Sequence, residues 1–150
     1  MIPRHHLTRA AGARLLALGA AAITIAAALG VRAVFSGAFA KYAGDALYTV
    51  LVYALVVAVA PRVRPVVAAG VALGVSWAVE FGQLTSVPAR LSAHSGLLRL
   101  VFGSTFNAPD LFWYAVGAAG AFAVHRWWRR CDRARLSGAY PNRPLWGPRS

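Results

Sequence analysis

The feature that most constrains this chain is an apolar run, residues 66–84, that contains a carboxylate. The run is 19 residues long, and a helix of that length spans roughly 28 Å, about the hydrocarbon thickness of a bilayer. Glu80 lies inside it, and an acid at the centre of a membrane helix costs about 2.5–3.5 kcal/mol on insertion scales. The sequence therefore predicts a membrane-spanning helix with an acid toward one end.

The composition indicates a membrane protein. Of 150 residues, 59% are hydrophobic and 13% are charged, whereas soluble domains carry about 25% charged residues. The formal charge is +12, but the basic residues flank the apolar runs, so we expect contact with anionic lipids at the basic tail and no nucleic-acid partner. The single cysteine, Cys131, excludes an internal disulfide and a cysteine-rich metal site. We expect no metal and no cofactor.

Four apolar segments are expected to span the bilayer. The prolines of the turn at residues 61–65 separate the second from the third. The polar stretch at 85–107 contains a short apolar segment, 97–102, that is too short to span and predicts an interfacial or re-entrant helix. The expected fold is an all-α membrane protein with four transmembrane helices, at residues 15–31, 45–60, 66–84 and 109–124.

This interpretation divides the chain into three parts. They are a basic cytoplasmic leader, a four-helix transmembrane domain and a basic cytoplasmic tail, at residues 1–14, 15–124 and 125–150. A cleaved signal peptide is the alternative for the first segment, because residues 38–40 have the A-x-A form of a cleavage site. The apolar run exceeds the usual length, and Arg32 separates it from that site, so we expect a retained first helix.

The distribution of basic residues predicts the orientation. Twelve of the sixteen Lys and Arg residues lie in the leader, the turn at 61–65 and the tail, and four lie on the other side. The positive-inside rule then places both termini in the cytoplasm of a multi-pass protein in the cell (inner or plasma) membrane.

With that orientation, three of the four acids converge near the extracytoplasmic face. Ser76, Glu80 and Gln83 share one helical face. Asp45 and Asp110 are expected to open the second and fourth helices, where acids also cap free N–H groups. Pure capping therefore stays open for both, and a structural polar knot stays open for Glu80. The candidate binding cluster is Asp45, Tyr48, Glu80, Gln83, Arg90, His94, Arg99, Asp110 and Tyr114.

The segments 41–48 (KYAGDALY), 80–84 (EFGQL), 100–106 (LVFGSTF) and 110–117 (DLFWYAVG) resemble the bacterial family of unknown function numbered 2809. The resemblance covers residues 15–124 and extends, more loosely, to VanZ-like envelope proteins. It implies a small four-helix inner-membrane protein and no established activity. At His94 many relatives are expected to carry an arginine.

Catalytic sequence patterns such as a Walker loop, G-x-S-x-G or H-E-x-x-H are absent from the sequence. We therefore expect a protein that is not an enzyme. Its cluster is expected to bind a lipid headgroup, an ion or a partner helix. Two alternatives are a membrane enzyme acting on a phospho-lipid and a small proton-coupled transporter using Glu80. Gly70 and Gly74 form a small-xxx-small pair on which a homo- or hetero-oligomer could assemble.

Overall fold

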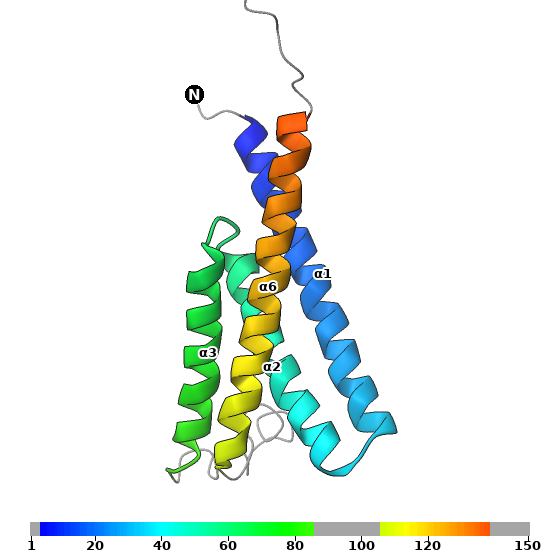
Figure 1. The fold of residues 1–150 in the computed structure, drawn as a ribbon, viewed down its shortest axis with the longest axis vertical. Helices are drawn as coiled ribbons and strands as arrows, with labels where there is room; N and C mark the ends of the chain where they lie inside the picture. Colours follow the sequence, from blue (N-terminus) through cyan, green and yellow to red (C-terminus); the bar gives the residue numbers. More distant parts are fainter. Residues whose placement is uncertain (1–3, 86–105, 139–150) are drawn as a thin grey trace, which may run out of the picture.

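The computed structural model describes residues 4–85 and 106–138, and all regular structure in these ranges is helical. Four helices follow one another in alternating directions: α1 (Arg4–Val34), α2 (Gly37–Val59), α3 (Pro65–Gly82) and α6 (Ala108–Gly138). The start of α1, the α2–α3 turn and the end of α6 therefore lie toward one end of the bundle (Figure 1). The α1–α2 connection and the start of α6 lie toward the other.

Three of the helices are long and apolar enough to cross a membrane: Ala10–Val34, Gly37–Val59 and Pro65–Gly82. Because it contains three such helices, the chain is an integral membrane protein. The fourth helix, α6, differs because Asp110 and His125 bracket its apolar part and arginines follow. The expected interfacial or re-entrant helix at 97–102 lies outside the described residues.

The boundary between α2 and α3 follows the prolines. Helix α2 ends at Val59, and α3 begins at Pro65, where the missing N–H is no loss because the first turn has no acceptor for it. The predicted start of the second helix at Asp45 is wrong. The connection from α1 is only residues 35–36, after which Gly37 adopts φ 69°, the left-handed region that glycine enters without steric cost. Residues 37–44, which the predicted helix at 45–60 left out, are therefore the first two turns of α2.

Helices α2, α3 and α6 pack against one another, while α1 packs on α2. On α3 the buried residues Ala68, Ala72, Ser76 and Glu80 recur one turn apart, and each is at most 1% exposed. This is the periodicity of one helical face. Ala68 and Ala72 form the apolar core with Tyr53 of α2. The large apolar side chains of α1, such as Leu15 and Ile23, point outward, as expected for side chains that contact lipid.

Helix α6 comes very close to α2 at Gly117. A Cβ built there would lie 2.2 Å from the carbonyl oxygen of Ala46 in α2, so only glycine fits. Gly70 and Gly74 are different, because a Cβ on either would meet no atom within 4 Å. The small-xxx-small pair of α3 therefore faces away from the other helices that the structure describes, and its use in an oligomer stays a prediction.

Candidate functional site

Glu80 is the most deeply buried charged residue of the bundle, with 1% of its surface exposed. The Asn107 backbone N–H donates to Glu80 Oε1 at 2.6 Å, and the Tyr114 hydroxyl donates to Glu80 Oε2 at 3.1 Å. Both donors come from α6 or the residue before it. A carboxylate on α3 thereby holds the entry of α6, and its two bonds are to neutral groups.

A second set of contacts joins α2 to α6 at the same end. The Lys41 ammonium donates to Asp110 Oδ1, and its Nζ lies 3.5 Å from Asp45 Oδ2 one turn along α2. The Asn107 side-chain amide also donates to Asp110 Oδ1, at 2.5 Å. Asp110 is buried, so its charge is compensated by an ammonium and an amide. Asp45 shares that one ammonium, and its Oδ2 accepts no hydrogen bond within the described part of the chain.

Polar pairs continue from this cluster into the bundle. The hydroxyls of Thr49 and Ser76 lie 2.9 Å apart, both fully buried, and Ser76 also donates to the Ala72 carbonyl. Hydroxyl pairs of this kind hold membrane helices together by about 0.6 kcal/mol each. Trp77 Nε1 adds a bond from α3 to the Leu111 carbonyl at 3.2 Å. Each pair of helices among α2, α3 and α6 is thus joined by at least one polar contact.

Residues 34–118 match the family described as protein of unknown function (DUF2809). The chain belongs to this family. The matched range contains α2, α3 and the first part of α6, which are the three helices that share the polar contacts. Searches of curated proteins and of solved structures returned no match, so the looser likeness to VanZ-like proteins has no support here.

In this DUF2809 chain, the expected residues Asp45, Glu80, Asp110 and Tyr114 come to one end of the bundle. Tyr48 lies beside Tyr114, with ring centroids 6.2 Å apart. Gln83 follows the last turn of α3 and is half-buried. The expected members Arg90, His94 and Arg99 lie outside the described residues.

Two residues of the cluster were not expected, Lys41 and Asn107. Lys41 lies before the predicted start of the second helix, although its spacing of four from Asp45 is the spacing of a helical ion pair and could have indicated the contact. Asn107 lies at the end of the polar stretch 85–107, and its backbone N–H donates to Glu80. The capping interpretation of Asp45 is wrong, because Asp45 lies in the third turn of α2. Asp110 does lie in the first turn of α6.

A metal centre has no geometric support in the ranges 4–85 and 106–138. No group of three or more His, Cys, Asp or Glu side chains there could hold a metal ion. What the cluster offers is two carboxylates near one ammonium at the end of the bundle, with a third carboxylate bound by neutral donors.

Proposed function

We propose that the chain is a four-span protein of the cell (inner or plasma) membrane with both termini in the cytoplasm. The fourth span is provided by α6. The basic tail is residues 125–150, and the basic leader is residues 1–14. The arrangement of charge supports this orientation. The α2–α3 turn, which contains Arg62 and Arg64, lies at the same end of the bundle as the start of α1 and the end of α6 (Figure 1). The first turns of α2, which contain Lys41, lie at the other end.

We further propose that the chain is not an enzyme and that its extracytoplasmic cluster binds a positively charged group. The observation that carries this proposal is that Asp45 and Asp110 share one ammonium, that of Lys41. Asp110 accepts the hydrogen bond of that ammonium, whereas Asp45 is half-buried and, among the described residues, has only the 3.5 Å contact. An amine or cation that reached Asp45 would complete its pairing. The amine of a lipid headgroup fits best, because the cluster lies at the end of the helices, where headgroups are found.

The test compares lipid binding by the full chain and by Asp45→Asn in detergent, measured by native mass spectrometry. Phosphatidylethanolamine carries an amine and phosphatidylglycerol does not. We expect Asp45→Asn to weaken phosphatidylethanolamine binding at least five-fold and to leave phosphatidylglycerol binding unchanged. Asp132→Asn is the matched control, since Asp132 is an exposed acid on α6 outside the cluster. Equal binding of the amine lipid by Asp45→Asn and the wild type would refute the proposal.

A small ion or a partner helix could provide the positive group instead of a lipid. Stabilisation of the wild type, but not of Asp45→Asn, by sodium or potassium chloride at constant ionic strength would indicate an ion. Co-purification of a second membrane protein that Asp45→Asn releases would indicate a helix.

Proton-coupled transport is the second candidate, and Glu80 is the observation that favours it. Its carboxylate is buried in the bundle and bonded to an N–H and a phenol, and acids inside the membrane are the residues from which proton relays are built. Proteoliposomes containing the wild type would then dissipate an imposed pH gradient, and Glu80→Gln would not. A phospho-lipid enzyme would need cations such as Arg90 and Arg99, which lie outside the described residues, so no observation favours it.

A further inference from the structure

The end of the bundle opposite to Glu80 carries a concentration of arginine. Arg62 and Arg64 lie on the α2–α3 turn, and α6 carries a stripe of four more: Arg126, Arg129, Arg130 and Arg133. Their spacing of i, i+3, i+4 and i+7 places the four on one helical face. Asp132, which is exposed, is the one acid of the chain at this end. This arginine surface, defined by these six residues, has a large excess of positive charge.

Direct contacts bring the two halves of the arginine surface together. Arg129 Nη1 donates to the carbonyl of Val63 at 3.3 Å, and Val63 lies between Arg62 and Arg64. One turn earlier on α6, His125 Nδ1 lies 2.8 Å from the Tyr53 hydroxyl, which also donates to the Pro65 carbonyl at 3.3 Å. These bonds fix the stripe of α6 against the turn.

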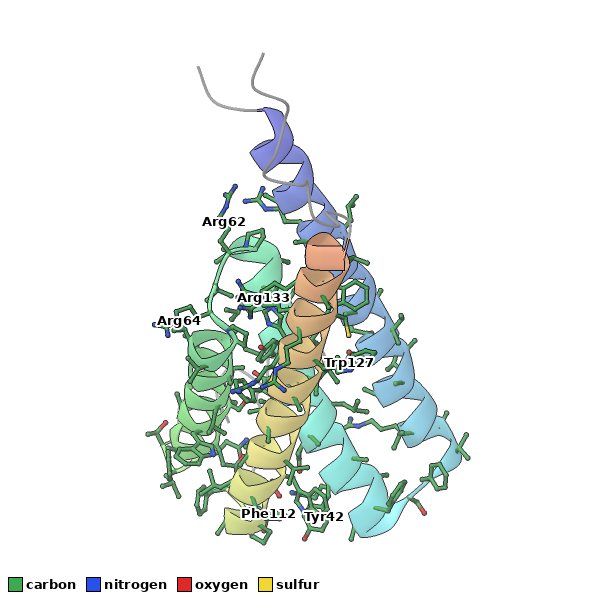
Figure 2. The ribbon with its side chains drawn as sticks, turned by 45° about the horizontal axis from the view of Figure 1, so that its top comes forward. Tyr42, Arg62, Arg64, Phe112, Trp127 and Arg133 are labelled. Atoms are coloured by element: carbon green, nitrogen blue, oxygen red, sulfur yellow. The ribbon has the colours of Figure 1, made fainter. Side chains whose placement is uncertain are left out.

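The arginine stripe of α6 faces the α2–α3 turn, whereas Trp127 lies on the other side of the helix. Figure 2 shows Arg62, Arg64 and Arg133 toward one side of α6 and Trp127 toward the other. Arg133 Nε donates to the Arg129 carbonyl at 3.2 Å, which keeps its guanidinium on the stripe. Arg64 and Arg130 are exposed, so the surface can receive a ligand.

The depth of the surface in the bilayer follows from the helix length. From Asp110 to Trp128 along α6 is about 27 Å at 1.5 Å per residue, close to one hydrocarbon thickness. Trp127 and Trp128 are exposed by 64% and 55%, and tryptophan favours the boundary between hydrocarbon and headgroups. The arginine surface therefore lies at the level of lipid phosphates.

We propose that the arginine surface between the α2–α3 turn and α6 is a binding site for the phosphate of an anionic phospholipid. Arginine suits this ligand because its planar fork pairs with two phosphate oxygens at once. Arginines from two elements would reach one headgroup from two sides. The positive-inside rule requires only an excess of basic residues on the cytoplasmic side. It does not require arginines from two elements to lie together. The inference rests on the proposed fourth span for the depth of the surface, and on the proposed orientation for the leaflet that supplies the lipid.

The test measures binding of phosphatidylglycerol and of phosphatidylcholine to the full chain in neutral detergent by native mass spectrometry. We expect the wild type to bind phosphatidylglycerol at least ten-fold more tightly. Arg64→Gln and Arg130→Gln, one from each half, should each weaken phosphatidylglycerol binding at least five-fold, and the double variant should lose less than the product of the two. Arg14→Gln is the matched control, because Arg14 is an exposed arginine on α1, and it should change binding less than two-fold.

Three outcomes would overturn the proposal. Equal weakening by Arg14→Gln would mean diffuse charge without a site. Equal affinity for the two lipids would remove the anion preference. Equal binding of soluble glycerol 3-phosphate would mean a free phosphate, not a lipid. Because detergent has no sidedness, these results do not depend on orientation, which a reporter fused after Ser150 tests separately. Size-exclusion profiles and melting temperatures like those of the wild type confirm that each variant is folded.

Discussion

The Tyr114 hydroxyl donates to Glu80 Oε2 at 3.1 Å, across the interface of α3 and α6. Tyr114 is 6% exposed and Glu80 1%, so neither group can exchange its partner for water. The same carboxylate accepts the Asn107 N–H. Glu80 therefore acts at least as a structural link at the entry of α6, whatever else it binds.

The first prediction uses Glu80→Gln to separate a structural role from a functional one. Glutamine keeps an oxygen for the Asn107 N–H, and its amide can donate to the Tyr114 oxygen. The loss should be small, because interhelical polar bonds in membranes average about 0.6 kcal/mol. We expect Glu80→Gln to insert normally and to melt in detergent within a few degrees of the wild type, while an activity that needs the charge is lost. Aggregation or degradation of Glu80→Gln would favour the structural knot.

Glu80→Leu is the companion variant. It leaves the Asn107 N–H and the Tyr114 hydroxyl without an acceptor, and an orphaned buried polar group costs about 1–3 kcal/mol. We expect a lower melting temperature than for Glu80→Gln. Tyr114→Phe in the same background should recover part of the loss, because it removes one orphan. No recovery would show that the Tyr114 bond contributes little.

The second prediction concerns the ammonium between two acids. Lys41→Met leaves the buried Asp110 carboxylate without its cation, and removing one partner of a buried pair is more harmful than removing both. We expect Lys41→Met to lower the melting temperature and Lys41→Met with Asp110→Asn to restore most of it. Each kcal/mol corresponds to roughly 2–4 °C for a chain of this size. A double variant no better than the single would mean that the Lys41–Asp110 pair adds little stability.

The third prediction is that α1 is retained in the mature protein. Ala17 and Ala21 of α1 are buried, and α1 packs on α2. The A-x-A sequence at 38–40 lies inside α2, where a peptidase would find a helix and not an extended chain. Mass spectrometry of the membrane-purified protein should find peptides that contain Arg32. A mature chain that begins at Lys41 would contradict retention.

The fourth prediction tests the orientation. A protein that fluoresces only in the cytoplasm should light up when it is fused after Ser150 and should stay dark when it is inserted after His94. Cys131, the single cysteine, gives an independent check. An impermeant maleimide added to intact cells should not label it, whereas labelling should occur after permeabilisation. The reverse pattern would move the acid cluster to the cytoplasmic side.

The sequence predicted the elements that strong local signals define. The α2–α3 turn followed from Pro61 and Pro65, and the placement of Ser76 and Glu80 on one face of α3 followed from their spacing. The start of α2 was predicted eight residues late, because a helix that begins after Gly44 leaves both Gly37 and Gly44 outside it. Only Gly37 has positive φ, and no local pattern distinguishes it from a helical glycine.

The partners of Glu80 could not be predicted for a different reason. Asn107 and Tyr114 lie 27 and 34 residues away along the chain, and their contact depends on the rotation of α6 against α3. Hydrophobic periodicity fixes which face of a helix is buried but not the register between two helices. Lys41 was missed because its ion pairs depend on the corrected start of α2.

The last prediction tests that register through the close contact of α6 with α2 at Gly117. Gly117→Ala would place a methyl group against the backbone of α2, since a Cβ there would lie 2.2 Å from the Ala46 oxygen and 3.0 Å from the Ala46 carbonyl carbon. A backbone cannot yield as a side-chain tip can, and overpacking of this kind costs about 1–3 kcal/mol. Gly120→Ala is the matched control three residues along α6, because a Cβ at Gly120 meets nothing within 4 Å. We expect Gly117→Ala to melt several degrees lower in detergent and Gly120→Ala to melt no lower than the wild type. Equal melting of the two variants would mean that α6 is rotated or shifted relative to α2, and with it the contacts of Asp110 and Tyr114.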